Sequence, residues 1–308
     1  MEPHAVIERH KATLLAIPGA TAVAIGKKTT GGQTTERDSI VVFVASKGEP
    51  AQEADRIPTE IEGIPTDVVE REFDFRSLAT DPFERHDPLI GGISLTAIED
   101  SHGYGTIGCF IAADGTVVGV PAGPYLLTNM HVVQVAAAPG GDTRVIQPGR
   151  VQPPVPLNYV CGTYVAGLRD ATHDCAITTV VGRAWRNEVP NHPWHPGRRP
   201  LTGLAAAALN DNVYKYGATT QHTIGTVANL NFNTAAINNA IYVVGDGGNP
   251  WCGEGDSGSV VVRYADDRVL ALLFCADTHT PVPGGYLAGL AYDITAQITV
   301  FSTVAQLA

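Results

Sequence analysis

Three separated segments of the chain carry the residue types used for nucleophilic catalysis. His131 follows the apolar run 125–129, Asp174 directly precedes the apolar run Cys-Ala-Ile, and Ser257 lies in Gly-Asp-Ser-Gly-Ser. A serine hydroxyl becomes a useful nucleophile when a neutral imidazole can take its proton, and a buried carboxylate keeps that imidazole in the required tautomer. The three segments therefore predict acyl-transfer chemistry with Ser257 as the nucleophile.

The glycines beside the serine support this role. Glycine tolerates the tight turn that would push the Ser257 hydroxyl outward, and such a turn lets the N–H groups of Gly255 and Ser257 converge as an oxyanion hole. Taken singly, each segment has an ordinary explanation: a packed or surface histidine, an aspartate at a strand start, or a Gly-Asp-Ser-Gly hairpin turn. The three together favour the catalytic interpretation.

Neighbouring residues compete for these roles less well. Asp170 is followed by Ala-Thr-His and not by a buried strand, while Ser259 stands beyond the turn without a preceding Gly-Asp. His173, adjacent to Asp174, is expected to flank the loop instead of acting as the base.

The pattern of short apolar segments predicts the elements that must position these residues. From residue 91 onward, segments of five to nine residues alternate with Gly, Pro, Asn and Asp, which favours a closed all-β barrel or a pair of barrels. The clearest expected strands are 106–112, 125–129, 175–181, 212–216, 241–245, 259–263 and 269–275. The loop 187–200 is expected to be irregular because it is rich in proline.

The first part of the chain has a different character. It predicts one amphipathic helix followed by strands, at 4–16, 20–27, 39–46 and 65–73. We therefore expect three parts: a small α/β module at 1–76, a linker at 77–90 containing Asp-Pro twice, and a β domain at 91–308.

The order histidine, aspartate, serine is the order found in chymotrypsin-type enzymes. Residues 90–300 resemble the trypsin-like serine protease superfamily through Leu-Leu-Thr-Asn-Met-His-Val-Val, Asp-Cys-Ala-Ile, Gly-Asp-Ser-Gly-Ser and Leu-Leu-Phe-Cys-Ala. These four motifs are most similar to those of the bacterial and plant branch that includes NARROW LEAF 1. The resemblance implies two six-stranded antiparallel β-barrels and a serine endopeptidase acting through an acyl-enzyme. It assigns the triad to His131, Asp174 and Ser257, and the oxyanion hole to Gly255 and Ser257.

The same resemblance raises a question about activation. In secreted relatives a freshly cut N-terminus pairs with the aspartate before the serine, here Asp256, but this chain shows no evident cleavage site. Asp256 must find another partner, or the site forms only when something binds. We therefore hypothesise conditional activity, regulated by a protein partner or by the N-terminal module. A catalytically idle scaffold and an esterase are the alternative functions.

The specificity pocket is expected around the nucleophile. Its candidates are Trp251, Cys252 and Gly253, which precede Ser257, and the strand end 274–277. Within that strand end, Asp277 either attracts a basic substrate side chain or is simply a solvated loop acid.

Composition limits the function further. A net charge of −11, with 20 basic and 31 acidic residues, argues against a nucleic-acid surface, and no window is long and apolar enough for a membrane span. No secretory signal is evident, and five cysteines without CxxC spacing favour reduced thiols in a cytoplasmic protein, with a bridge between Cys252 and Cys275 left open. His192 and His195 lack cysteine partners at zinc-binding spacing, so we expect neither metal nor cofactor.

Overall fold

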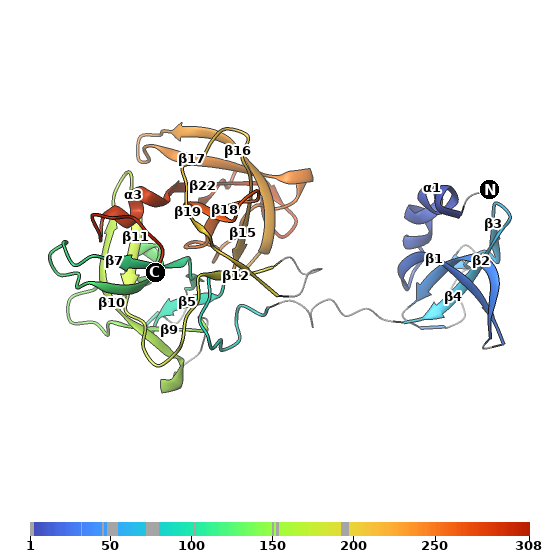
Figure 1. The fold of residues 1–308 in the computed structure, drawn as a ribbon, viewed down its shortest axis with the longest axis horizontal. Coiled ribbons are helices and arrows are strands. Elements are labelled where there is room, and N and C mark those ends of the chain that lie inside the picture. The colour runs from blue at the N-terminus through green and yellow to red at the C-terminus, as the bar shows by residue number, and fades with distance from the viewer. Residues whose placement is uncertain are drawn as a thin grey trace. The chain divides into compact units, whose positions relative to one another are not determined.

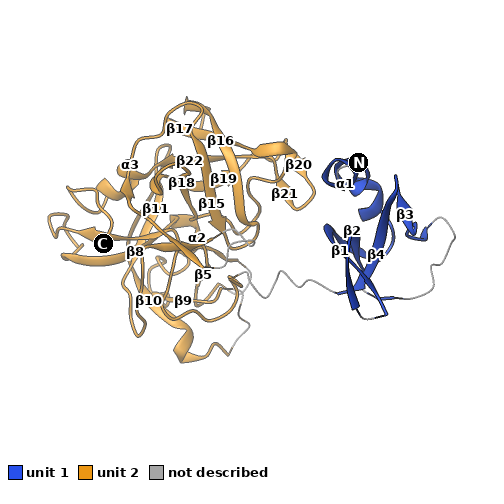
Figure 2. Ribbon diagram, turned by 45° about the vertical axis from the view of Figure 1, so that its right-hand side comes forward, with its two compact units in different colours: residues 1–75 blue, residues 76–308 orange. Residues whose placement is uncertain are grey.

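The chain forms two compact units, Met1–Phe75 and Arg76–Ala308, in a computed structural model (Figure 1, Figure 2). The structure describes residues 3–31, 33–44, 46–47, 55–71, 80–100, 103–149, 151, 154–191 and 197–308. The two units are described separately.

The first unit packs one helix on a four-stranded sheet of order β1-β2-β4-β3, in which β2 and β4 are parallel. Val6, Ile7 and Leu14 of the helix are buried against alternate residues of β2, since one face of a strand carries every second side chain. The elements are α1 (Pro3–Leu15), β1 (Ala20–Thr30), β2 (Gln33–Val44), β3 (Glu60–Ile61) and β4 (Ile64–Glu70). The short β3 was not expected from the sequence.

The second unit begins with a sheet of order β6-β5-β9-β10-β11-β8-β7. The two ends of this order, β6 and β7, belong to one continuous segment, so the sheet curls back toward its own first strand. Its elements are β5 (Ser94–Ala97), β6 (Gly105–Thr106), β7 (Cys109–Ala113), β8 (Gly123–Thr128), α2 (Met130–Val133), β9 (Arg144–Ile146), η3 (Leu157–Tyr159), β10 (Val160–Arg169) and β11 (Asp174–Thr178). We call this part the first barrel.

The remaining strands form the second barrel. Its order is β19-β18-β15-β16-β17-β22, and β22 pairs back with β19, which closes a ring of six antiparallel strands. Its elements are β14 (Gly203–Leu204), β15 (Asn212–Gly217), β16 (Gln221–Phe232), β17 (Ala240–Gly245), η4 (Asp246–Gly248), β18 (Val260–Arg263), β19 (Arg268–Ala276), β20 (Pro281–Val282), β21 (Gly285–Tyr286), β22 (Ala288–Asp293) and α3 (Ile294–Thr299). The mainly β architecture with two barrels after a small α/β part is thereby confirmed.

Two segments differ from the sequence-based expectation. Residues 80–90, expected in the linker, are bonded into the second unit: Tyr216 donates to the carbonyl of Thr80, and Leu89 and Ile90 are fully buried. The proline-rich loop 187–200 contains two paired strands, β12 (Glu188–Pro190) and β13 (Arg198–Pro200). Proline has no N–H to donate to a neighbouring strand, but Pro190 and Pro200 are each the last residue of a strand, where the sheet tolerates this loss. Within the described part of the chain, no helix has the length and apolarity to cross a membrane.

Candidate active site

Strand pairing in the first barrel brings His131 and Asp174 together. Asp174 is the first residue of β11, which pairs with β8, and His131 lies in α2, the single helical turn that follows β8. Asp174 is buried, with its side chain 5% exposed; the carboxylate Oδ2 lies 2.7 Å from His131 Nδ1, and Oδ1 accepts from the His131 backbone N–H at 3.1 Å. The carboxylate therefore fixes both the ring and the backbone of the histidine, and the Nδ1 contact leaves Nε2 as the nitrogen that can act as a base.

Ser257 comes from the second barrel, in the turn between β17 and β18. The half-buried hydroxyl donates a long hydrogen bond of 3.4 Å to the Phe274 carbonyl, and among the described residues it makes none to His131. The Ser257 carbonyl accepts from the Thr106 N–H of the first barrel at 2.8 Å, which ties the turn across the two barrels. Catalytic hydrogen bonds are often long before substrate binds, so this geometry is compatible with a nucleophile at rest.

The turn around the serine requires glycine at two positions. Gly255 and Gly258 have φ of +92° and +95°, and a Cβ would lie 2.2 Å from the Tyr104 ring at the first position and 2.3 Å from the Thr106 carbonyl oxygen at the second. Within the described chain the N–H groups of Gly255 and Ser257 make no hydrogen bond. Two donors thus remain for an oxygen placed beside the serine, as an oxyanion hole requires.

Asp256 finds its partner inside the chain. Its Oδ2 lies 3.0 Å from Nζ of Lys215 on β15, and both side chains are essentially unexposed, at 1% and 0%. The same carboxylate accepts from the N–H groups of Thr219, Thr220 and Gly253 and from the Thr220 hydroxyl. A buried carboxylate with a cation and four further donors is satisfied, so the turn ending in Ser257 is anchored without a cut N-terminus.

The residues expected to line the specificity pocket lie in different places. Trp251 and Cys252 are buried in the core of the second barrel, and the Gly253 N–H is used by Asp256. The Asp277 carboxylate accepts from the Tyr242 hydroxyl at 2.8 Å and from the His279 N–H at 3.0 Å, so it is engaged in its own turn. Burial, and then the bond to Asp277, raise the pKa of Tyr242 to about 12.

A cavity of about 330 Å³ adjoins the histidine. One wall is apolar, where Phe274 and Tyr292 stack with ring centroids 4.1 Å apart. The exposed Arg169 also lines the cavity, with Nε 3.5 Å from Asp174 Oδ2. The lining residues are His131, Arg169, Asp170, Asp174, Ala236, Ile237, Phe274, Cys275 and Tyr292. Of the expected pocket residues, only Phe274 and Cys275 of the strand end 274–277 line this space.

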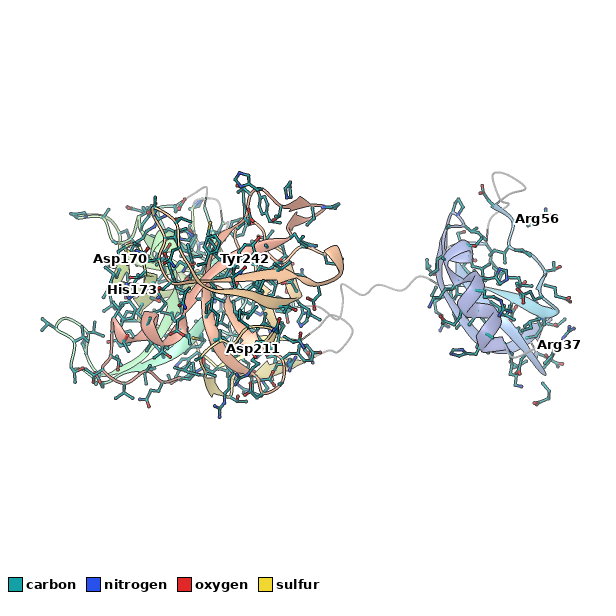
Figure 3. The ribbon with its side chains drawn as sticks, turned by 90° about the horizontal axis from the view of Figure 1, so that it is seen from above. Arg37, Arg56, Asp170, His173, Asp211 and Tyr242 are labelled. Carbon is teal, nitrogen blue, oxygen red and sulfur yellow. The ribbon has the colours of Figure 1, made fainter. Side chains whose placement is uncertain are left out.

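The competing residues have other surroundings than the triad roles require. Asp170 binds Thr172 and His173 in a tight turn, where Figure 3 labels Asp170 and His173 side by side. Burial raises the pKa of Asp170, but the bonds from Thr172 and His173 outweigh it and lower the pKa to about 2. Ser259 is fully buried.

All five cysteines are free, which includes Cys252 and Cys275. The described residues contain no cluster of three or more His, Cys, Asp or Glu side chains suited to a metal ion. His192 and His195 lie outside the described residues.

The second unit has the chymotrypsin-like serine protease fold, which comparison with solved structures shows directly. One neighbour is the Nocardiopsis protease NAPase, at TM-score 0.52 and 14% identity over 71% of this chain and 98% of that one. Another is protease A of Thermobifida fusca, at TM-score 0.50 and 18% identity over 71% and 97%. A glutamic-acid-specific serine protease aligns at TM-score 0.52 and 16% identity over 71% and 100%. No protein-family model matches the chain, and no curated protein matches it in sequence.

Sequence reasoning missed three residues of this site: Lys215, Thr219 and Tyr104. Lys215 interrupts an otherwise apolar strand, Val-Tyr-Lys-Tyr-Gly, and a lone lysine inside a β-branched and aromatic run is the signal that would have found it. Thr219 and Tyr104 stand in loops without any distinctive pattern.

Proposed function

We propose that this chain is a serine endopeptidase that cleaves a protein or peptide substrate through Ser257, His131 and Asp174. The observation that carries the proposal is the His131–Asp174 pair, which is joined by two hydrogen bonds. It lies in the same unit as a glycine turn whose Gly255 and Ser257 N–H groups make no hydrogen bond within the described chain. A protease fold alone would not require these groups, because folds host many functions.

The proposed mechanism follows from the positions of the groups. His131 Nε2 takes the proton as Ser257 Oγ attacks the substrate carbonyl, and the N–H groups of Gly255 and Ser257 stabilise the oxyanion that forms. Asp174 keeps the ring oriented and stabilises the imidazolium. His131 then gives its proton to the leaving amine, and water hydrolyses the acyl-enzyme by the same steps.

Covalent labelling tests this proposal without a known substrate. A fluorophosphonate probe should label the wild-type chain but not Ser257→Ala, and His131→Ala should label at least about a hundredfold more slowly, since removal of a triad member costs orders of magnitude. Equal labelling of wild type and Ser257→Ala would refute the assignment. Thr202→Val, a surface change far from the triad in sequence, is the matched control.

A catalytically idle scaffold on the same fold is the second candidate. The observation that favours it is the Ser257 hydroxyl, whose hydrogen bond goes to the Phe274 carbonyl and not to His131. If no Ser257-dependent labelling appears, even with candidate protein partners present, the scaffold becomes the better interpretation.

Conditional activity remains part of the proposal. The first unit has its own cavity of about 500 Å³, lined in part by Leu14, Ile17 and Pro58, which offers a place for a regulatory partner. A truncated chain without the first unit tests this regulation. Because residues 80–90 are bonded into the second unit, the truncation removes residues 1–75 only. Unchanged labelling and unchanged substrate choice after truncation would refute regulation by this unit. Membership of the NARROW LEAF 1 branch and a cytoplasmic location remain predictions from the sequence.

A further inference from the structure

The direction of the Gly255 N–H depends on the peptide that joins Glu254 to Gly255. A trans peptide is planar, and its N–H points opposite to its carbonyl. Whatever holds the Glu254 carbonyl therefore sets where the Gly255 N–H points. Because Gly255 has no side chain, rotation of this peptide is opposed by few local clashes of its own.

The Glu254 carbonyl is held by a chain of two hydroxyl groups. Thr219 Oγ1 donates a short hydrogen bond to that carbonyl oxygen, and Tyr104 Oη lies 3.1 Å from the same Thr219 Oγ1. A threonine hydroxyl has one proton, and here it points at Glu254, so Tyr104 must be the donor in the second bond. The chain of donors runs from Tyr104 to Thr219 to Glu254.

Both hydroxyl-bearing residues, Thr219 and Tyr104, are themselves fixed. The Thr219 N–H donates to Asp256 Oδ1 at 2.8 Å, so the buried ion pair with Lys215 also positions the threonine. Tyr104 lies just before β6 in the first barrel, and its ring packs edge-on against Phe83 at 5.1 Å. The Tyr104 ring also covers Gly255, where an added Cβ would fall 2.2 Å from a ring carbon.

We propose that Thr219 and Tyr104 are positioning residues that orient the Glu254–Gly255 peptide so that the Gly255 N–H faces the oxyanion. This inference rests on the proposed function. A hydrogen bond accepted by the Glu254 carbonyl also polarises the peptide and strengthens its N–H as a donor, since linked hydrogen bonds reinforce one another. Because Tyr104 belongs to the first barrel and Glu254 to the second, the oxyanion hole is complete only when the two barrels are packed against each other as in this structure.

The test measures fluorophosphonate labelling of the full-length chain, separated into probe affinity (KI) and the rate of bond formation (kinact). The phosphoryl oxygen of the probe occupies the oxyanion hole, so kinact reports on the Gly255 donor. Thr219→Val should lower kinact by about 10- to 30-fold, less than the ~100-fold or more for complete loss of one donor, with KI within about twofold. Tyr104→Phe, which removes only the hydroxyl, should lower kinact by about threefold.

Two controls make the result specific. Thr219→Ser keeps the hydroxyl and should restore kinact to within about twofold of wild type. Thr202→Val removes another exposed threonine hydroxyl that donates to a backbone carbonyl, that of Asp266, and should leave kinact unchanged. Thr219 is exposed, so its variants are expected to fold, and Tyr104→Phe provides an independent answer.

The outcomes are distinguishable. If wild type shows no Ser257-dependent labelling, the proposed function fails. If wild type labels normally while Thr219→Val and Tyr104→Phe label as fast as wild type, the proposed function stands and the positioning role is refuted. If Thr219→Ser is as slow as Thr219→Val, the hydroxyl is not the operative group and the inference is also refuted.

Discussion

Replacing Lys215 by methionine tests what anchors the turn that carries Ser257. The ammonium lies 3.0 Å from Asp256 Oδ2, and neither side chain is more than 1% exposed. Breaking a buried ion pair on one side costs about 3–5 kcal/mol, because a charge is left without its partner. Asp256 keeps hydrogen bonds from Thr219, Thr220 and Gly253, so we expect a loss near the lower end, about 3 kcal/mol.

Urea unfolding followed by tryptophan fluorescence measures this loss. Trp185, Trp194 and Trp251 all fall within the second unit, so their signal reports on that unit alone. The double variant Lys215→Met with Asp256→Asn should recover most of the stability, because neutral groups replace the pair without leaving a buried charge.

Labelling of Lys215→Met should separate the two consequences of the ion pair. Displacement of Asp256 moves the turn that carries the Ser257 N–H, so the labelling rate should fall by about 100-fold, the effect of losing an oxyanion donor. A solvent-exposed ion pair contributes at most about 1 kcal/mol to the free energy of unfolding. A Lys215→Met variant that loses no more than this and labels at the wild-type rate would therefore refute the role of the buried pair as the anchor of the turn.

Three further predictions follow from the same structure. Gly217→Ala should slow labelling in the same way, because its Cβ would lie 2.3 Å from Asp256 Oδ1; a wild-type rate would mean that the carboxylate can move freely. Iodoacetamide should modify the half-buried Cys275 before the fully buried Cys252 and so block the cavity beside the histidine. Burial raises the pKa of both thiols, that of Cys252 to about 12, so the more accessible Cys275 should react first, and peptide mass mapping checks the order. Asp170→Asn should destabilise the second unit at neutral pH, because the ionised carboxylate is the form that the native turn stabilises. The difference in urea midpoint between wild type and variant should shrink as the pH falls from about 4, the pKa of an unfolded aspartate, toward about 2, the pKa in the folded chain.

The His131–Asp174 pair and the glycine turn at Ser257 could be predicted from sequence, because each residue stands in a local pattern. A strand end, a strand start and a glycine turn are all properties of a few consecutive residues, and the sequence order supplied the rest. The two-barrel architecture was equally accessible, since short strands with regular turn signals have few alternatives.

The partners of the supporting residues could not be predicted, because these residues meet their partners through closure of the barrels. Lys215 reaches Asp256 over 41 residues, and Tyr104 reaches Thr219 over 115. The specificity pocket was misjudged for the same reason: proximity to Ser257 in sequence suggested Trp251, but strand pairing turns that ring into the core. The hairpin at 188–200 was missed because prolines at strand ends resemble prolines within a loop.

The closed ring of six strands has a consequence for how this chain would gain and lose activity. Lys215 belongs to β15, and Asp256 leads into β18, the strand paired with it, so the turn is anchored as soon as the ring forms. The anchoring of Asp256 is then a product of folding itself and needs no cut N-terminus. Heat should therefore abolish fluorophosphonate labelling at the temperature at which the second barrel melts.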